Sequence, residues 1–338
     1  MVRRRRGRGF EYVDSSGRPV RDRETLERIS ELAVPPAWKE VWICTDPLGH
    51  LQATGLDAAG RKQYRYHDGW RERRDQQKFD SMLEFARALP SMRRRVTRDM
   101  RQTEMDRTRV LACATRLLDL GFFRIGSEDY AERNESYGLA TMRKDHVSIE
   151  DGEVVFDYAA KGGKRRIQAI CDDGVLEIVG QLKRRRGGGS ELLAYRDRRR
   201  WRDIRSDDIN EYVKSVTAHD FTAKDFRTWN ATVLAAVALA LHPDPPTTKA
   251  ARRRVINAAV RGVAEYLGNT PAVARSSYID PRVFDRYLSG WTIGGRMDDV
   301  GREADLADPR TRARIEAAVL DLLEDERGSP ALEKLAAA

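Results

Sequence analysis

The spacing of hydrophobic residues changes near residue 68, and this change divides the chain into two regions. Between residues 10 and 67, short apolar runs such as residues 41–44 alternate with turn sequences such as residues 46–49. Short apolar runs between turns are typical of a small, mostly antiparallel sheet. We expect one helix within this region, near residues 23–32, ahead of the two prolines at residues 35–36.

Helical spacing dominates from residue 68 onward. A charged helical stretch runs to Pro90, and a second long helix ends before Gly121. Three short apolar segments then predict a three-stranded meander within residues 147–170. Its last two strands are expected to be joined by a hairpin turn at residues 161–164, which read Lys-Gly-Gly-Lys.

Beyond Asp172, nearly every segment up to Leu323 has helical spacing. Breaks are expected at residues 187–189, 243–246 and 294–295, where glycine or proline is concentrated. The pattern therefore predicts the α+β class.

Two domains are expected from this division of the chain. Residues 1–78 are expected to form a small β-rich domain, and residues 79–338 a larger, mostly helical domain that contains the three-stranded sheet. The last five residues, Lys-Leu-Ala-Ala-Ala, resemble a vector-derived tail and carry no functional argument.

Arginine gives the chain its positive charge. The 338 residues include 62 Lys and Arg against 53 Asp and Glu, for a formal net charge of +9, and arginine far outnumbers lysine. Because the guanidinium fork matches two phosphate oxygens and sheds water readily, this excess favours a phosphate-bearing partner. Nucleic acid is the expected partner, ahead of an anionic membrane, although a high-GC codon bias would also raise the arginine content.

Other chemistry finds little support in the sequence. Cys44, Cys113 and Cys171 are isolated and odd in number, which predicts reduced thiols in a cytosolic protein. No apolar stretch is long enough to span a membrane, and residues 3–6, four arginines, lack the apolar region of a signal peptide and are expected to form a basic arm. The five histidines are scattered and no P-loop is present, so we expect neither a metal nor a nucleotide cofactor.

One tyrosine and one arginine suggest a reaction. Tyr278 follows Arg227 by about fifty residues, each in a separate segment of helical spacing. A phenol can attack a phosphodiester while an arginine holds the phosphate. With an ordinary pKa around 10, the phenol needs positive neighbours to act at neutral pH. Taken alone, such a tyrosine is more often a packing residue.

Five short motifs occur in an order that makes the chemistry specific. They are Phe-Arg-Ile-Gly around Arg124, Lys-Gly-Gly-Lys from Lys161, Lys-Asp-Phe-Arg-Thr around Arg227, Leu-Gly-Asn-Thr-Pro around Asn269, and Ser-Tyr-Ile-Asp-Pro around Tyr278. In this order and spacing they resemble the active site of the type IB DNA topoisomerases, in particular the compact poxvirus and bacterial branch. In the first region, Pro-Pro-Ala-Trp at residues 35–38 and Gly-Arg-Lys-Gln-Tyr-Arg-Tyr-His at residues 60–67 also resemble bacterial members.

The resemblance implies a fold and a reaction. The helical domain would have the catalytic fold shared by type IB topoisomerases and tyrosine recombinases, and the first domain would bind DNA. The enzyme would relax supercoiled duplex DNA through a 3′-phosphotyrosyl intermediate, with neither ATP nor metal. It would act as a monomer in the cytoplasm, on the nucleoid.

The resemblance also assigns roles to the site residues. Tyr278 would be the nucleophile, Arg124 and Arg227 would stabilise the nonbridging oxygens, and Lys161 would protonate the leaving 5′-oxygen. Asn269 stands where poxvirus enzymes have histidine, and its amide can donate a hydrogen bond but supplies no proton. Nearby, Lys224 would contact phosphate and Asp225 would orient Arg227. These last two roles come from the resemblance alone.

Further DNA contacts are expected in the first domain. Gln63 and Tyr64 would touch base edges or backbone, and Arg61 and Tyr66 would touch phosphates. Tyr64 and Tyr66 share one face of a strand, so aromatic packing is the alternative interpretation. Tyr130 also matches a DNA-contacting position of the family. The basic runs at residues 93–95, 183–186 and 196–200 are more typical of solvated helix faces.

Two other functions remain open at this point. A tyrosine recombinase or integrase uses the same chemistry but usually carries histidine where this chain has Lys224. The β-rich first domain also departs from the helical one of recombinases. A non-catalytic protein that clamps duplex DNA would bind with steep salt dependence and leave DNA topology unchanged.

Overall fold

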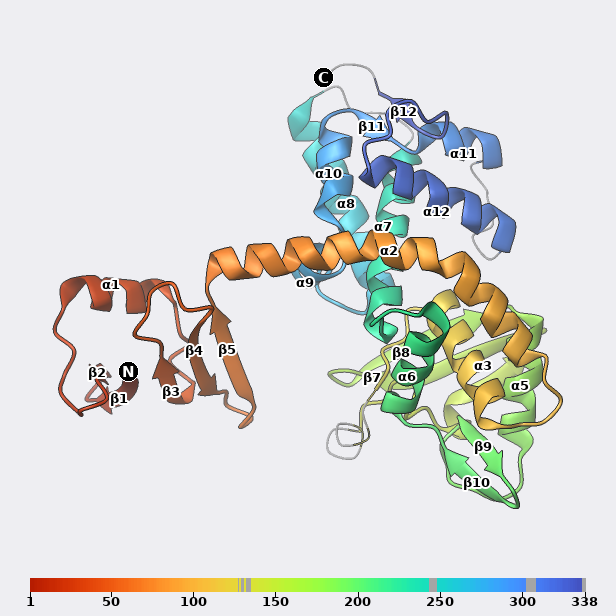
Figure 1. Ribbon diagram of the computed structural model, residues 1–338, viewed down its shortest axis with the longest axis horizontal. Helices are drawn as coiled ribbons and strands as arrows, with labels where there is room; N and C mark the ends of the chain where they lie inside the picture. The colour runs from red at the N-terminus through yellow and green to blue at the C-terminus, as the bar shows by residue number, and fades with distance from the viewer. Residues whose placement is uncertain (127, 129–130, 132–134, 243–247, 302–307, 336–338) are drawn as a thin grey trace. The chain divides into compact units, whose positions relative to one another are not determined.

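The computed structural model describes residues 1–126, 128, 131, 135–242, 248–301 and 308–335 (Figure 1). It divides into two compact units, residues 1–81 and residues 82–338. The first is built around a small sheet and the second is mostly helical, so the predicted α+β class is confirmed.

A five-stranded antiparallel sheet with the strand order β2-β1-β3-β4-β5 forms the first unit. Its strands are β1 (Val2–Arg6), β2 (Gly9–Val13), β3 (Lys39–Ile43), β4 (Leu51–Leu56) and β5 (Lys62–Tyr66). Helix α1 (Arg23–Glu31) covers one face, where Ile29 packs on Val41, Ile43 and Ala53. The expected helix and the mostly antiparallel sheet are therefore both present.

The four arginines expected to form a basic arm lie instead in strand β1. The side chain of Arg3 is buried, and its guanidinium donates hydrogen bonds to the carbonyls of Val34, Pro35 and Trp38. These three acceptors satisfy most of its donors, which offsets the cost of burying the charge. The other three arginines are part of the same strand, because β1 pairs with β2 and β3.

Helix α2 (Asp68–Met100) runs without interruption through Pro90, where the sequence predicted the end of a helical stretch. An interior proline costs about 3 kcal/mol because it removes one backbone hydrogen bond and crowds the preceding turn. Phe85, Leu89 and Met92 are fully buried on either side of it, while Pro90 itself is exposed. Burial of these side chains offsets the local cost.

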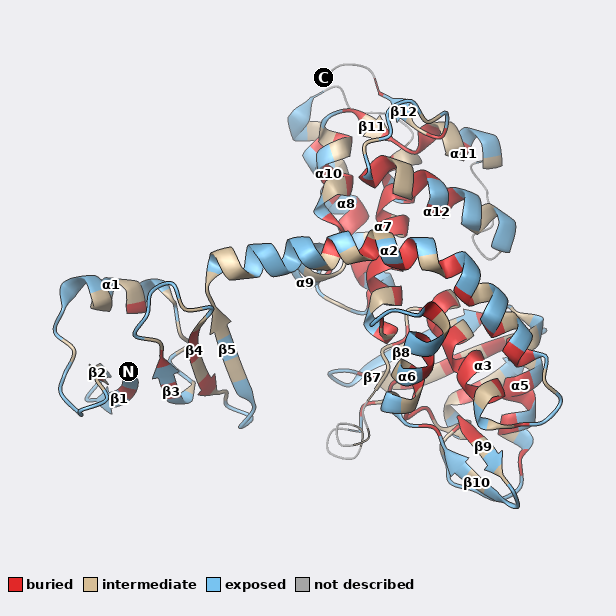
Figure 2. Ribbon diagram, in the orientation of Figure 1, coloured by how far each residue is buried: buried red, intermediate tan, exposed pale blue. Residues whose placement is uncertain are grey.

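Nine helices, among the residues that the structure describes after α2, build most of the second unit. They are α3 (Arg107–Leu120), α5 (Asp173–Arg184), α6 (Ser206–Thr217), α7 (Ala223–Ala240), α8 (Lys249–Leu267), α9 (Pro271–Ser277), α10 (Pro281–Leu288), α11 (Gly294–Val300) and α12 (Pro309–Leu323). Figure 2 shows that α3 and α7 are largely buried. Helix α7 packs on α3, α8, α10 and α12, which explains why its sequence is apolar on nearly every side.

The predicted meander is present as a three-stranded antiparallel sheet. A 3₁₀ turn, η1 (Lys144–His146), leads into β6 (Val147–Glu150), β7 (Glu153–Ala160) and β8 (Lys164–Ile170). Helix α5 packs on β6 and β7. The turn between β7 and β8 is the predicted hairpin, with Gly162 and Gly163 both at positive φ.

Three further strands, β9 to β11, lie in the region predicted to be almost entirely helical, and a fourth, β12, lies beyond it. Strands β9 (Ala194–Asp197) and β10 (Arg200–Asp203) form a hairpin over the basic run at residues 196–200, and β11 (Trp291–Thr292) pairs with β12 (Glu333–Lys334). The run at 196–200 is thus a hairpin and not a helix face.

Gly294 and Gly295 begin helix α11, although the sequence predicted a break there. A Cβ at Gly294 would collide with a Glu333 carboxylate oxygen, and one at Gly295 would lie 2.5 Å from the Pro330 carbonyl. The absence of a Cβ at both glycines therefore allows the last segment of the chain to pack closely against the start of α11. In that segment Leu335 is buried and donates to the Gly290 carbonyl at 2.7 Å, so part of the expected tail is integrated in the fold. The predicted break at 243–246 falls wholly outside the described residues.

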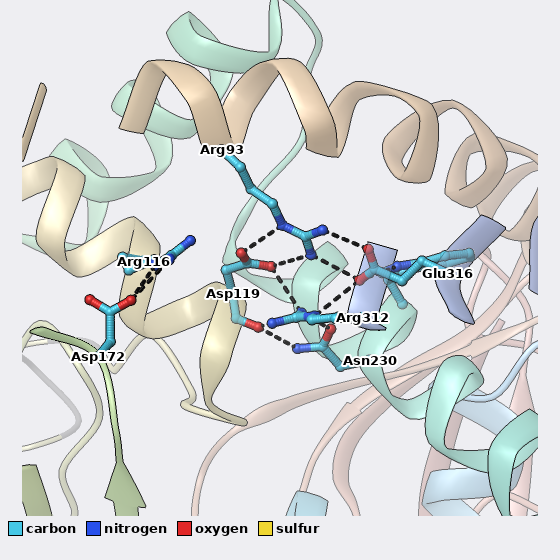
Figure 3. Close-up of polar contacts among 8 residues, drawn as sticks. Arg93, Arg116, Asp119, Asp172, Asn230, Arg312 and Glu316 are labelled. Atoms are coloured by element: carbon cyan, nitrogen blue, oxygen red, sulfur yellow. Dashed lines mark hydrogen bonds and ion pairs between the residues drawn. The ribbon is translucent and has the colours of Figure 1, made fainter. Parts of the chain in front are cut away.

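Arg93, expected on a solvated helix face, belongs to a buried ionic network that joins four helices (Figure 3). Its guanidinium binds the Asp119 carboxylate of α3 at 2.8 Å and the Glu316 carboxylate of α12 at 2.6 Å. Arg312, also on α12, binds both carboxylates and the side-chain oxygen of Asn230 on α7. Two positive and two negative charges balance inside the network, so each is paired despite burial.

Candidate active site

A cavity of about 330 Å³ in the helical unit gathers five of the predicted site residues. They are Tyr278, Arg227, Arg124, Lys161 and Lys224. They come from the end of α9, from α7, from the segment after α3 and from the turn between β7 and β8. The fold thus brings together side chains that are more than 150 positions apart in sequence.

Tyr278 is held at the junction of two short helices. It ends α9, where its N–H donates to the Ala274 carbonyl at 3.1 Å, and the buried Asp280 starts α10 two residues later. On the neighbouring α7, the Thr232 hydroxyl bonds to the Tyr278 carbonyl at 3.4 Å and receives the Asp280 N–H at 3.1 Å. The backbone of Tyr278 is therefore fixed from both sides.

The Tyr278 ring lies against Arg227. The guanidinium carbon is 5.2 Å from the ring centroid, close enough for its positive charge to act on the phenol. Burial alone would raise the pKa of the phenol, but the charges of Arg227 and Arg124 outweigh it. The pKa of Tyr278 is consequently lower than that of a free tyrosine, which favours the attacking phenolate.

Arg227 is 4% exposed and anchored by two carbonyls, those of Phe122 and Leu267. Burial and the repulsion of Arg124 lower the pKa of Arg227 to about 10, so the side chain stays charged at neutral pH. Its Nε atom is buried and has no hydrogen-bond partner in the part of the chain that the structure describes. A buried charged donor without an acceptor is costly, and a phosphate oxygen would satisfy it.

Asn269 presents a second unpaired donor. Its side-chain oxygen accepts a hydrogen bond from Arg124, so its amide nitrogen is the end that remains for another partner. That nitrogen is buried and bonds to none of the described residues. The two free donors, on Asn269 and Arg227, belong to residues that both line a second cavity of about 820 Å³, as do Arg124 and Lys161.

Helix α8 ends beside these residues. Gly268 adopts the left-handed conformation at φ 62° and lets Asn269 leave the helix axis. Arg124 donates to the Gly268 carbonyl at 3.1 Å, and Arg227 donates to the Leu267 carbonyl at 2.9 Å. A third arginine, Arg166 on β8, donates to the preceding carbonyl, that of Tyr266.

Arg166 is the site residue that sequence reasoning missed. It follows the Lys-Gly-Gly-Lys hairpin in a basic run, and strand alternation places Arg166 and Lys164 on the same face of β8. That alternation was the only available signal. It gives no information on the distant helix end that Arg166 contacts.

Lys161 and Lys224 line the cavity, and neither ammonium group forms a hydrogen bond or ion pair with another described residue. Lys161 is exposed at the hairpin tip, and Lys224 is exposed in the first turn of α7. The positive charge of Lys224 helps to lower the pKa of Tyr278, after the larger effects of burial, Arg227 and Arg124. Both ammonium groups are free to reach a bound strand.

Asp225 fixes the start of α7, and its expected orientation of Arg227 stays a prediction. Its carboxylate accepts hydrogen bonds from the N–H and the hydroxyl of Thr222, which forms the capping box of α7. The residue therefore fixes the start of the helix that carries Lys224 and Arg227.

The four DNA contacts predicted in the first domain lie on β5 or in the turn before it. Arg61 and Gln63 both bond to the Asp57 carboxylate at 2.9 Å. Tyr64 is 47% exposed and stacks on Tyr66 at 6.0 Å between ring centroids. Their DNA contacts remain predictions, and Tyr130 lies outside the described residues.

No cluster suited to a metal ion was found in the described ranges: nowhere in them do three or more His, Cys, Asp or Glu side chains come together. A search of the same residues found no helix with the length and hydropathy needed to cross a membrane.

Comparison with known proteins gives a consistent result for both units. Residues 67–288 match the family model of the eukaryotic DNA topoisomerase I catalytic core, and residues 9–57 match that of the N-terminal domain of bacterial DNA topoisomerase IB. DNA topoisomerase 1B of Acanthamoeba polyphaga mimivirus is 29% identical over 294 residues, covering 82% of this chain and 84% of the viral protein. DNA topoisomerase 1B of vaccinia virus (strain Copenhagen) is 18% identical over 250 residues, covering 73% and 75%.

Proposed function

The chain belongs to the type IB DNA topoisomerases, and from this premise we propose how its own residues cleave and rejoin one strand of duplex DNA. The observation that carries the proposal is the convergence of Tyr278, Arg227 and Arg124 on one cavity, with two buried donors unpaired beside it. A phosphodiester in that cavity would meet a nucleophile and oriented cations together.

Tyr278 is the nucleophile in this mechanism. Its oxygen forms a bond to the scissile phosphorus while the bond from phosphorus to the 5′-oxygen breaks. The products are a 3′-phosphotyrosyl bond and a strand that ends in a 5′-hydroxyl. Rotation of the free end relaxes supercoils, and the 5′-hydroxyl then attacks the phosphorus and releases the tyrosine.

Arg124, Arg227 and Asn269 bind the nonbridging oxygens. The unpaired Nε of Arg227 and amide nitrogen of Asn269 are already directed by their bonds to Leu267 and Arg124. Donors that are oriented before the reaction need little reorganisation when charge builds up on the phosphate. Removal of one such donor typically lowers the rate by about 10²- to 10³-fold.

Lys161 is the general acid for the leaving 5′-oxygen. The hairpin tip lets its ammonium approach the strand, and both cavities include it. Proton transfer to a leaving group typically contributes on the order of 10²- to 10⁴-fold. Lys224 would contact a phosphate next to the scissile one, and the β5 residues Gln63 and Tyr64 would contact the duplex.

The exchange conserves one phosphoester bond at each step, so it requires neither ATP nor a metal ion. We propose that the enzyme acts as a monomer on the bacterial nucleoid in the cytoplasm. A recombinase would share the covalent step but would exchange strands between two duplexes, and a passive clamp would form no covalent bond.

Plasmid relaxation tests the proposal. The purified protein should relax supercoiled plasmid in EDTA without ATP, and brief denaturation should trap protein linked covalently to a DNA 3′-end. Tyr278→Phe should abolish both results and still bind duplex DNA. Relaxation by the Tyr278→Phe variant would rule out this nucleophile, while strand exchange between two duplexes would favour the recombinase.

A further inference from the structure

Three arginines from three separate elements converge on the end of α8. Arg166 of β8, Arg227 of α7 and Arg124 after α3 donate to the consecutive carbonyls of Tyr266, Leu267 and Gly268. The last carbonyls of a helix lack partners within it and carry the negative end of the helix dipole. The end of α8 therefore holds three like charges close together before any phosphate is bound.

Arg166 is fixed on several sides. Its Nε donates to the Gln168 side-chain oxygen at 2.9 Å, another nitrogen donates to the Tyr266 carbonyl, and the phenol of Tyr158, which is 4% exposed, interacts with the guanidinium electrostatically. Within the described part of the chain it forms no ion pair with a carboxylate. The partners of Arg166 are thus neutral oxygens. They fix the direction of its guanidinium but do not neutralise its positive charge.

The position of Arg166 matters because the residues directly after Tyr266 belong to the active site. The carbonyls of Leu267 and Gly268 orient Arg227 and Arg124, and the next side chain is Asn269. Gly268 leaves the space that the guanidinium of Arg166 uses: a Cβ there would come within 2.8 Å of Arg166 Nη1. Arg166 and the end of α8 are therefore packed as one unit.

We propose that Arg166 is a positioning residue for strand cleavage. Arg166 fixes the last turn of α8. That part of the helix then holds Arg227, Arg124 and the Asn269 amide in the geometry that the transition state needs. The inference rests on the proposed function and deepens it, since Arg166 acts through these residues without touching the reacting atoms.

A matched pair of variants tests this role. Arg166→Ala should slow covalent adduct formation by about 10- to 100-fold, because a displacement of about 1 Å at a reacting centre has that effect. The control is Arg327→Ala, an exposed arginine of the same unit that is paired with Asp325. Its rate should stay within about twofold of the parent. Single-turnover cleavage of an end-labelled duplex at saturating protein removes any effect on DNA affinity.

A double-mutant cycle separates positioning from a direct DNA contact. If Arg166 acts through Asn269, Arg166→Ala should cost much less in an Asn269→Ala background than in the parent. Two independent contacts would instead multiply their losses. The rising limb of the pH–rate profile should also move to higher pH in Arg166→Ala, because displaced arginines no longer lower the pKa of Tyr278.

Arg166→Lys is a control for misfolding, since it keeps the positive charge and loses only the planar guanidinium fork. It should fold with the parent's circular dichroism and cleave at an intermediate rate. Parental cleavage by Arg166→Ala, or fully multiplicative losses in the cycle, would overturn the inference. If the parent protein itself formed no adduct, the proposed function would fail first, so the two failures are distinguishable.

Discussion

The ionisation of Tyr278 depends on the balance between burial and positive charge. Burial raises its pKa, whereas Arg227 and Arg124 lower it further than burial raises it. Cleavage should accelerate with pH up to the lowered pKa and then level off. Removal of one arginine should therefore move the rising limb of the pH–rate profile to higher pH.

Arg124→Ala tests this dependence. Its rising limb should shift upward, and cleavage at neutral pH should fall by about 10²- to 10³-fold, because an oxygen-binding donor is lost as well. Single-turnover adduct formation from pH 6 to about pH 10 measures both effects. An unchanged limb with a lower plateau would mean that Arg124 does not act on the phenol.

Asn269 offers a test of donor against acceptor at one atom. Asn269→Asp keeps the oxygen that Arg124 binds and replaces the unpaired amide nitrogen with a second oxygen. Cleavage should fall by about 10²- to 10³-fold, and Asn269→His, whose ring N–H can donate, should retain more activity. Equal cleavage rates for Asn269→Asp and the parent would contradict the proposed contact between the Asn269 amide and a nonbridging phosphate oxygen.

The end of helix α8 allows a comparison of two glycines in one element. Gly268→Ala should destabilise the protein by about 1 kcal/mol because φ is 62°, and should slow cleavage, because the new methyl group would crowd Arg166. Gly262→Ala is the control: apart from the nearby backbone of α8, no heavy atom of the described residues lies within 4 Å of its added Cβ, and it should stabilise α8 by about 0.5–1 kcal/mol. Urea unfolding and single-turnover cleavage measure the two effects. A slow Gly262→Ala variant would show that cleavage responds to any change in α8.

Elements whose signals are local could be predicted from the sequence, and those set by distant partners could not. Helix α1, the β6–β8 meander and its glycine turn are predictable from spacing and turn residues alone. Strands β11 and β12 are two residues each and form only because residues 291 and 334 meet in the fold. Continuation of α2 through Pro90 depends likewise on buried neighbours.

The active site shows the same division. Five motifs in a family's order led to Tyr278, Arg124, Arg227, Lys161 and Asn269, and the structure places them around two cavities that share Arg124, Arg227 and Lys161, while their catalytic roles stay predictions. Arg166 was missed because its contact is a backbone carbonyl, which every residue has and no motif records. The capping role of Asp225 could have been predicted from Thr222, three residues earlier, in addition to the role that the resemblance implies.

At the scale of the whole helical unit, the buried network couples stability to the active site. Asn230, one turn after Arg227, donates to the Asp119 carbonyl at 3.1 Å, and Trp229 donates to Glu316 at 3.3 Å. The network thus ties α7, which carries Arg227, to α3 and α12 (Figure 3). Loss of one member leaves the others as buried, unbalanced charges.

Asp119→Asn should destabilise the helical unit by about 3–5 kcal/mol, because Arg93 and Arg312 both lose a charged partner. The exposed pair Arg23–Glu27 provides the control, and Glu27→Gln should change stability by less than about 1 kcal/mol. Urea unfolding followed by circular dichroism measures both. Equal effects of the two substitutions would mean that burial of the network contributes nothing.

The same carboxylate predicts how acid unfolds the protein. Burial would raise the pKa of Asp119, but Arg312 and Arg93 lower it to about 2, below the value of 3.8 expected for an unfolded chain. Since the folded pKa is the lower one, the stabilisation is complete above about pH 4 and is lost as the pH falls through about 2. Asp119→Asn should therefore show a shallower loss of stability between pH 4 and pH 2 than the parent. Parallel acid-unfolding curves would place the sensitive carboxylate elsewhere, because an asparagine cannot titrate in this window.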